Sequence, residues 1–387
     1  DAIVLAGVLR SNSTLKTLNI SNGDIGDYER EEIGNALVKN LNGRTGYCDA
    51  YGLKENGPAA HPLIDLKEKD VIRTKRSFSL FAGLLRANRT ITSLTLSGLG
   101  PEYIDVLAEA LATNTTMQSL RLEQPSKAAD TQIATLPVQQ LNGALKQAEI
   151  DLSLAGGDKV DGSQPMHRHA CGVVGAILAA NSTISRLKIN PGGGSEGGSI
   201  LEHIHRARKS SLATLDLTGI GLAERGGSRI FETLLAGKCG FLKTIHLGSN
   251  ALTDMAVGQL LVDTFRSELC NISTLDIHDN QIGAGVVCQA IKYNRSLTNL
   301  DIRKCPIEDE GLGNIGVLLL LPECPCHLRY ISCDAFEIND GETELKIRKE
   351  TLGPGETRLL CGVFKWNNLI KDLNLSGRGI ECDAATV

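Results

Sequence analysis

The chain has 387 residues, of which 40 are Lys or Arg and 45 are Asp or Glu, so its formal net charge is −5. This mildly acidic balance provides no basic field for nucleic acid or an anionic membrane surface. Aromatic residues make up only 4% of the chain, which argues against ligand binding by stacking, and the 41 glycines lack the period of collagen. The apolar runs at residues 3–9 and 315–321 are far shorter than the ~20 residues of a membrane-spanning helix, so we expect no membrane insertion.

A helical pattern opens the chain at residues 1–12, and a short strand pattern, Leu15-Lys-Thr-Leu18-Asn-Ile20, follows it. In this phrase an apolar residue, two variable residues, a second apolar residue, one variable residue and a third apolar residue follow one another. Such alternation predicts a short strand with one buried face. The phrase recurs at residues 91–96, 117–122, 184–189, 212–217, 242–247, 272–277, 297–302 and 370–375, with shorter versions at 150–152 and 345–347.

Amphipathic runs follow most copies of the phrase, for example at residues 104–114 and 286–294. Their apolar spacings of three and four residues predict helices with one buried stripe. We expect the asparagines that close these runs to adopt the left-handed conformation that ends a helix. These residues are Asn12, Asn88, Asn114, Asn181, Asn294 and Asn367.

Two similar segments interrupt the alternation. Cys48-Asp-Ala-Tyr51 and Cys333-Asp-Ala-Phe336 stand where a strand is due, and each precedes a glycine-containing turn and another strand phrase. Further on, residues 81–84 correspond to residues 361–364. We interpret this as a duplicated block and expect irregular strand-only units near residues 43–66 and 328–347. A bulging loop is the alternative for residues 43–62.

Strand, turn and helix at steps of 25 to 30 residues resemble the leucine-rich repeat family, and the full helix in each unit is similar to its ribonuclease-inhibitor-like class. In this family an Asn or Cys after the strand ties the turn with its side chain, and Asn250, Asn280 and Cys305 occupy that position. The resemblance implies an α/β fold, a leucine-rich repeat solenoid (horseshoe) with parallel strands on the concave face and helices on the convex face. We expect residues 1–387 to form a single solenoid, a fragment of a longer array.

The variable residue between the last two apolar positions of each phrase points out of the concave face in such a solenoid. Parallel strands stack about 4.8 Å apart, so these residues form a column. Because aspartates on neighbouring strands repel one another, we expect a protein partner with a basic surface. The alternative is that the polar column only keeps the face soluble. The candidate partner-binding residues are Arg121, Asp151, Lys188, Asp216, His246, Asp276 and Asp301, and Lys346 and Asn374 continue the column.

A glycine-rich segment at residues 192–197 contains G-x-G-x-x-G, and Asp216 follows about twenty residues later, as in a dinucleotide site. A lone match is weak, and neighbouring units have the same frame, so we interpret the segment as a repeat turn and expect no cofactor. No nucleophile triad, phosphate loop or kinase motif set is present, so we do not expect an enzyme.

Histidines and cysteines offer two alternatives for zinc, His167-Arg-His169-Ala-Cys171 and the set Cys324, Cys326, His327 and Cys333. Since no C-x-x-C pair exists, we expect no metal. The 11 cysteines are scattered through apolar positions, which favours reduced thiols. Glycans on Asn19 or Asn374 would cover the strand face. Both points favour the cytoplasm or another intracellular reducing compartment, with cytoskeletal association as a further option.

The sequence therefore predicts a non-catalytic protein–protein interaction or scaffold module, a structural subunit of a larger complex, that binds no nucleic acid. Two alternatives stay open. One is a GTPase-activating protein of the Ran activator type, whose repeats supply loop residues, with Arg121 and Arg186 as candidates. The other is the sensor repeat domain of a larger nucleotide-binding receptor.

Overall fold

In the computed structural model, the described residues are 2–20, 25–48, 51, 53, 63–65, 74–124, 131–155, 166–190, 211–236, 240–371 and 373–376. They divide into two compact units. The described residues up to Leu212 form the first unit and those from Ala213 onward form the second. No helix in these ranges combines the length and the apolar content that crossing a bilayer requires.

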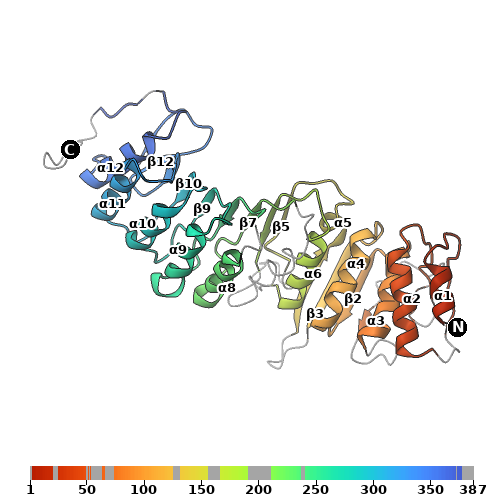
Figure 1. Ribbon diagram of the computed structural model, residues 1–387. Coiled ribbons are helices and arrows are strands. Elements are labelled where there is room, and N and C mark those ends of the chain that lie inside the picture. Colours follow the sequence, from red (N-terminus) through yellow and green to blue (C-terminus); the bar gives the residue numbers. More distant parts are fainter. Residues whose placement is uncertain are drawn as a thin grey trace. The chain divides into compact units, whose positions relative to one another are not determined.

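The first unit alternates helices with short strands (Figure 1). Strands β1, β2 and β3 pair in parallel, β4 pairs antiparallel with β3, and β5 and β6 form another parallel pair. The helices are α1 (Ala2–Leu9), α2 (Asp27–Lys39), α3 (Lys75–Ala87), α4 (Ile104–Thr113, after the 3-10 turn Pro101–Tyr103), α5 (Val138–Leu141) and α6 (Arg168–Leu178). The strands are β1 (Leu63–Asp65), β2 (Ser93–Ser97), β3 (Ser119–Gln124), β4 (Gln132–Pro137), β5 (Glu149–Leu152) and β6 (Arg186–Ile189).

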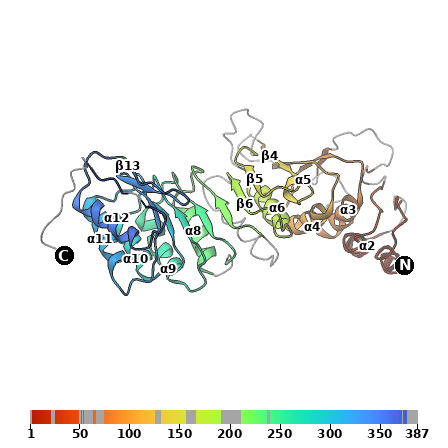
Figure 2. The ribbon, with the colours of Figure 1, turned by 90° about the horizontal axis from the view of Figure 1, so that it is seen from above.

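In the second unit, β7 to β11 form a parallel sheet, and β12 and β13 extend it antiparallel. Helices α8 to α11 lie side by side on one side of these strands (Figures 1 and 2). The strands are β7 (Thr214–Asp216), β8 (Thr244–His246), β9 (Thr274–Asp276), β10 (Asn299–Asp301), β11 (Tyr330–Ser332), β12 (Phe336–Ile338) and β13 (Lys346–Ile347). The helices are α8 (Ala223–Leu235), α9 (Gln259–Arg266, after the π-helical turn Asp254–Gly258), α10 (Ala284–Tyr293), α11 (Asp309–Leu320) and α12 (Pro354–Phe364).

The expectation that all strands are parallel is wrong at β4, β12 and β13. A parallel neighbour needs a crossover connection of about a dozen residues or more. The connections that lead into these three strands are shorter than that, so each chain segment turns back beside the strand it has just left. The segment at residues 328–347 accordingly contains strands and no helix.

The apolar positions of the repeated phrase form the core. In the central copies they are almost completely buried, as at Leu275, Ile277 and Leu300. In the first and last copies, by contrast, Leu15 is 37% exposed and Leu373 is 47% exposed. Among the described residues these two copies have a neighbouring repeat on one side only, which shows that each repeat depends on its neighbours for burial.

The helix-ending asparagines join the repeats through their side chains. Asn114 donates from Nδ2 to the Leu85 carbonyl oxygen of the preceding repeat (2.6 Å) and accepts at Oδ1 from the backbone amides of Thr116 and Met117. The expected left-handed backbone is wrong, because φ at Asn88, Asn114 and Asn294 lies between −65° and −80°. The same pattern of side-chain hydrogen bonds occurs at Asn88, Asn181, Asn294 and Asn367.

Two helix pairs, α2 with α3 and α11 with α12, share one unusually close contact. A Cβ atom added at Gly34 of α2 would lie 2.3 Å from the Ser79 carbonyl carbon in α3. One added at Gly316 of α11 would lie 2.3 Å from the Arg358 carbonyl carbon in α12. In each pair a second glycine, Gly83 or Gly362, stands four residues after the contacted residue and packs against the first glycine.

A cation stands three residues after the second glycine in both pairs. Arg86 Nε donates to the Leu37 carbonyl oxygen at 2.7 Å, and Lys365 Nζ donates to the Leu319 carbonyl oxygen at 3.2 Å. Each cation thereby satisfies the carbonyl end of the preceding helix, where positive charge is favourable. These matching contacts show that the duplicated block includes both helix pairs. They pair Gly83 with Gly362, which is one residue away from the sequence alignment of residues 81–84 with 361–364.

The glycine contacts predict a difference between two substitutions in neighbouring helices. Gly316→Ala forces a methyl group against the α12 backbone, so we expect it to destabilise the chain by ~1–3 kcal/mol. Gly285→Ala in α10 is the control, because its added Cβ meets no atom within 4 Å and removing a helical glycine stabilises by ~0.5–1 kcal/mol. Urea unfolding of the two variants measures both effects. Equal stability of the two variants would contradict the close contact.

His167 caps α6 and is 6% exposed. Its Nδ1 accepts from the Ala170 amide (3.3 Å), and Nε2 lies 3.3 Å from the Leu122 carbonyl oxygen, which defines a neutral ring with its proton on Nε2. Burial lowers the pKa of His167 to about 4, although the Leu122 carbonyl acts in the opposite direction. The unfolded chain therefore binds this proton first, and stability must fall as the pH decreases from about 6.5 to about 4.

This burial predicts a pH-dependent stability that one substitution removes. Asn can replace the Nδ1 acceptor of the cap, so His167→Asn should fold. As the pH falls from 6.5 to 4, the free energy of unfolding should decrease in the wild type by up to about 3 kcal/mol more than in the variant. Urea unfolding of both proteins at several pH values provides the measurement. His169, whose pKa burial also lowers, is present in both proteins and cancels. Parallel stability curves would show that His167 is not the titrating group.

Candidate functional site

The predicted column of polar residues is in register across β7 to β10. Asp216 lies opposite His246, His246 opposite Asp276, and Asp276 opposite Asp301. We call the side of the β7–β11 sheet that bears these four residues the strand face. Because neighbouring parallel strands lie about 4.8 Å apart, the four side chains can contact one another along this face.

Beyond Asp301 the column differs from the prediction. Asp301 pairs with Ser332, which pairs with Glu337, and Lys346 comes only after Glu337. The expectation that Lys346 directly follows Asp301 is therefore wrong, because β11 and the reversed strand β12 lie between them. Sequence reasoning missed Ser332 and Glu337, since neither belongs to a complete copy of the repeated phrase.

The three remaining candidates lie in the first unit and form two groups. Asp151 and Lys188 are opposite each other on β5 and β6, with 3.6 Å between the carboxylate and the ammonium group. Arg121 lies on β3, in the sheet formed by β1 to β4, where its Nε contacts Glu123 at 2.9 Å. The structure thus brings Asp151 together with Lys188, whereas Arg121 belongs to another sheet.

A local hydrogen bond explains why aspartate recurs in this column. In each case Oδ1 accepts from the backbone amide two residues further on, where the strand ends. For Asp276 the donor is His278 (3.0 Å), and for Asp301 it is Arg303 (3.1 Å). Such Asx turns are a structural reason for Asp or Asn at these positions. The same bond occurs at Asp151, Asp216 and Asn374.

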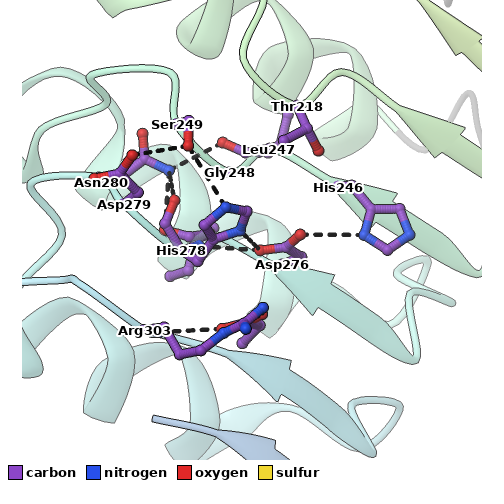
Figure 3. A network of polar contacts seen from close by, with 12 residues as sticks. Thr218, His246, Leu247, Gly248, Ser249, Asp276, His278, Asp279, Asn280 and Arg303 are labelled. Carbon is purple, nitrogen blue, oxygen red and sulfur yellow. Dashed lines mark hydrogen bonds and ion pairs between the residues drawn. The ribbon is translucent and has the colours of Figure 1, made fainter. Parts of the chain in front are cut away.

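Opposite charges or polar partners also lie beside these carboxylates (Figure 3). Asp276 lies between two imidazoles, with His278 Nδ1 at 2.6 Å from Oδ1 and His246 Nδ1 at 3.2 Å from Oδ2. The guanidinium group of Arg303 binds both oxygens of Asp301. We refer to these five residues, His246, Asp276, His278, Asp301 and Arg303, as the Asp276 cluster.

Burial of Asp276 raises its pKa, but the hydrogen bonds from His246 and His278 outweigh burial and hold the pKa below its usual range. Asp276 is therefore ionised at neutral pH. The sequence-based argument that unpaired aspartates await a basic partner is wrong for Asp151, Asp276 and Asp301, because each already has a partner within the chain.

Beneath the cluster, the turns after the strands are tied as the repeat pattern predicts. Asn280 Nδ2 donates to the Leu247 and Ile277 carbonyl oxygens, both at 2.9 Å, and its Oδ1 accepts from the Asn250 amide. Cys305 donates from Sγ to the Ile277 carbonyl oxygen at 3.2 Å. The non-glycine residues with positive φ in the described part of the chain, Ser249, Ala251, Asp279 and Lys304, lie in these turns.

The cysteine set considered for zinc has other roles in the structure. Cys326 Sγ contacts the Leu297 carbonyl oxygen and Cys333 Sγ that of Phe336, both at 3.5 Å. Burial raises the pKa of Cys326 to about 12 and that of Cys333 to about 11, so both thiols are protonated at neutral pH. His327 stacks on Trp366 with ring centroids 3.8 Å apart. The glycine-rich segment 192–197 lies outside the described residues.

One group of side chains in the described ranges has the spacing that a metal ion requires. It consists of Asp276, His278 and Asp301, each of which offers one ligand atom, and these atoms lie within 4.8 Å of one another. Composition and motif spacing did not reveal this group, because His278 lies outside the repeated phrase. The recurring two-residue Asx turn was the signal that could have placed it beside Asp276.

Comparisons with known proteins agree with the repeat. The model of the family described as "Leucine Rich repeat" matches residues 11–27 and 293–316. Human "NACHT, LRR and PYD domains-containing protein 5" is 24% identical over 233 residues, which cover 56% of this chain. The match spans only 19% of that relative's length. The repeated phrase and these matches support a leucine-rich repeat protein with an α/β fold.

Three solved structures show a distant likeness, each at 13% identity. LegL7 from Legionella pneumophila has a TM-score of 0.35 over 95% of both chains. Leiomodin-1 actin-binding site 2 has a TM-score of 0.31 and covers 44% of this chain and 90% of its own. The TLR13–ssRNA13 complex has a TM-score of 0.25, with 78% of this chain and 30% of that chain covered. At these TM-scores none of the three carries an argument about function.

The Asx turn predicts different effects for two substitutions of one residue. Asp276→Ala removes the acceptor of the His278 amide and should cost ~1–3 kcal/mol, whereas Asp276→Asn keeps an oxygen at this position and should cost less than half as much. Urea unfolding at neutral pH measures both variants. Equal losses would mean that the charge of Asp276, and not its hydrogen bond, stabilises the turn.

Proposed function

We propose that the chain is a non-catalytic protein-binding module that contacts its partner through the strand face of the second unit. Leucine-rich repeat proteins present such faces, formed by stacked strands, to other macromolecules. Here the observation that carries the proposal is the register of Asp216, His246, Asp276 and Asp301, which places a continuous row of polar side chains on the face opposite the buried leucines.

The internal contacts of the Asp276 cluster support recognition by fixed side chains. Ordering free side chains at an interface costs roughly 0.5–1.5 kcal/mol for each one, and a side chain already held by a neighbour avoids most of that cost. Asp276 and Asp301 are both held in this way. Because Asp301 is paired with Arg303 and Asp276 is hydrogen-bonded to two imidazoles, we propose a partner with a mixed polar surface in place of a purely basic one.

The repeat class, the arrangement of the repeats and the cellular compartment that we propose are those expected from the sequence. We propose the ribonuclease-inhibitor-like class and a horseshoe arrangement, supported by the full helix in most repeats. The cysteines in the described part of the chain are all free thiols and most are buried, which supports a reducing intracellular compartment. We also propose that the chain is a subunit of a larger complex.

A second candidate is favoured by one comparison. The match with a NACHT, LRR and PYD domains-containing protein supports the alternative that this chain is the sensor repeat domain of a larger nucleotide-binding receptor. The sequence on either side of the chain in its gene decides between them, because a receptor would encode a nucleotide-binding module there. The Ran activator alternative gains no support, since Arg121 and Arg186 lie within strands β3 and β6 and not in loops.

The proposal predicts that bulky charges on the strand face abolish partner binding. Thr244 and Thr274 lie opposite each other on β8 and β9. Each stands two residues before His246 or Asp276 and therefore points to the same side of the sheet, so Thr244→Arg and Thr274→Arg should block the strand face. Affinity capture from cell extract, with quantitative mass spectrometry, compares each variant with the wild type. We expect at least a ~tenfold loss of the specific partner, equivalent to about 1.4 kcal/mol.

Gln289→Arg is the matched control, because residue 289 is exposed on α10, among the helices. This variant should retain the partner. Loss of the partner in Gln289→Arg, with retention in both threonine variants, would move the interface to the helices and overturn the proposal.

A further inference from the structure

The three side chains with metal-compatible spacing come from two neighbouring repeats. Asp276 ends β9, and His278 follows it by two residues (Figure 3). Asp301 ends β10 in register with Asp276. The spacing of about 4.8 Å between strands brings both carboxylates within reach of a single ion. Their side chains are only 13% and 14% exposed, so the two negative charges lie close together with limited access to water.

His278 distinguishes this pair from other adjacent positions of the column. In the other Asx turns that the structure describes, the residue that donates the amide is Ser153, Thr218, Arg303 or Ser376, and among these turns the one at Asp276 alone has a histidine there. The donor set is therefore one nitrogen and two carboxylate oxygens. Zn²⁺ and related divalent transition ions accept such a mixed set, whereas Mg²⁺ and Ca²⁺ prefer oxygen ligands alone.

The hydrogen-bond partners of His278 and Asp276 are also consistent with a metal site. Metal-ligating histidines generally donate their other ring N–H to a hydrogen-bond acceptor. His278 Nε2 lies 3.5 Å from Ser249 Oγ, and that hydroxyl donates to Asp279 Oδ2 at 2.8 Å. On the other side, His246 Nδ1 contacts the second oxygen of Asp276 at 3.2 Å and orients the carboxylate.

We propose that Asp276, His278 and Asp301 bind one divalent transition-metal ion of the zinc type on the strand face. Without the ion, His278 donates from Nδ1 to Asp276 Oδ1 at 2.6 Å. When the ion binds, Nδ1 gives up this proton and becomes a ligand, the neutral ring carries its one proton on Nε2, where Ser249 Oγ accepts it, and Nδ1 and Oδ1 move to about 3 Å apart to admit the ion. No electron transfer accompanies binding. Three protein ligands leave at least one coordination position for water.

Arg303 opposes this binding and makes the proposal testable in both directions. Its guanidinium group binds Asp301 and must leave at least one carboxylate oxygen before the ion can coordinate. Removing this cation should therefore strengthen metal binding, although it removes a hydrogen-bond partner of Asp301. A merely structural cluster predicts no such gain.

The test is isothermal titration of the 387-residue chain with ZnCl₂ at neutral pH, after dialysis against a chelator. We expect one site that Asp276→Asn or His278→Gln weakens at least about tenfold and that Arg303→Gln strengthens about tenfold. Asp276→Asn keeps the Asx-turn acceptor, and circular dichroism checks that each variant is folded. Titration with MgCl₂ under the same conditions should show no binding at this site.

Asp216→Asn is the matched control, since Asp216 makes the same Asx turn but lies two strands from Asp276, beside His246 and not beside a proposed ligand. It should bind Zn²⁺ as the wild type does. Equal affinity in Asp276→Asn, His278→Gln and the wild type would place the bound zinc elsewhere, for example on thiols, and would overturn the proposal. The absence of binding in both the wild type and Arg303→Gln would overturn it as well. Neither result bears on whether the strand face binds a protein.

Discussion

The structure depends on one constraint, which is that a single repeat cannot bury its own apolar phrase. Three apolar side chains on a short strand and one apolar stripe on a helix leave most of their surface exposed unless another repeat covers them. The exposure of Leu15 and Leu373 beside the complete burial of central residues such as Leu215 shows this dependence directly. Every other feature, including the strand face, follows from stacking repeats to satisfy it.

Stacking would leave backbone groups unsatisfied between repeats, and short polar side chains bind them. Asn114 and its equivalents connect the end of one helix to the preceding repeat, and Asn280 connects one strand turn to the turn before it. Asp276 and Asp301 act within their own repeat, where each binds the backbone amide two residues further on. Buried backbone groups without such partners would cost several kcal/mol in total, so these residues are as much a part of the repeat as its leucines.

The same local bonds determine what the strand face can do. An aspartate that accepts from the amide two residues later holds its carboxylate near the next side chain, so a histidine at that position is drawn to Asp276 and an arginine to Asp301. The face is therefore a set of paired polar and charged side chains and not a simple acidic stripe. This pairing supports recognition of a mixed polar surface, and it assembles the nitrogen and oxygen donors of the proposed metal site.

The sequence by itself determined the repeat, its strands and helices, the buried leucines, the turn roles of Asn250, Asn280 and Cys305, and the order of residues along the column from Asp216 to Asp301. The strands, helices, buried leucines and column are local or periodic, and hydrophobic spacing reveals them. The turn roles follow from the resemblance to leucine-rich repeat proteins. Only the tertiary structure decided that β4, β12 and β13 run antiparallel, that Gly34 and Gly316 allow close helix contacts, and that His278 and Arg303 approach the aspartates. The physical reason is that these contacts depend on which backbone segments lie side by side. Residues such as Gly316 and Arg358, or His278 and Asp301, belong to no periodic pattern from which their contact could be predicted.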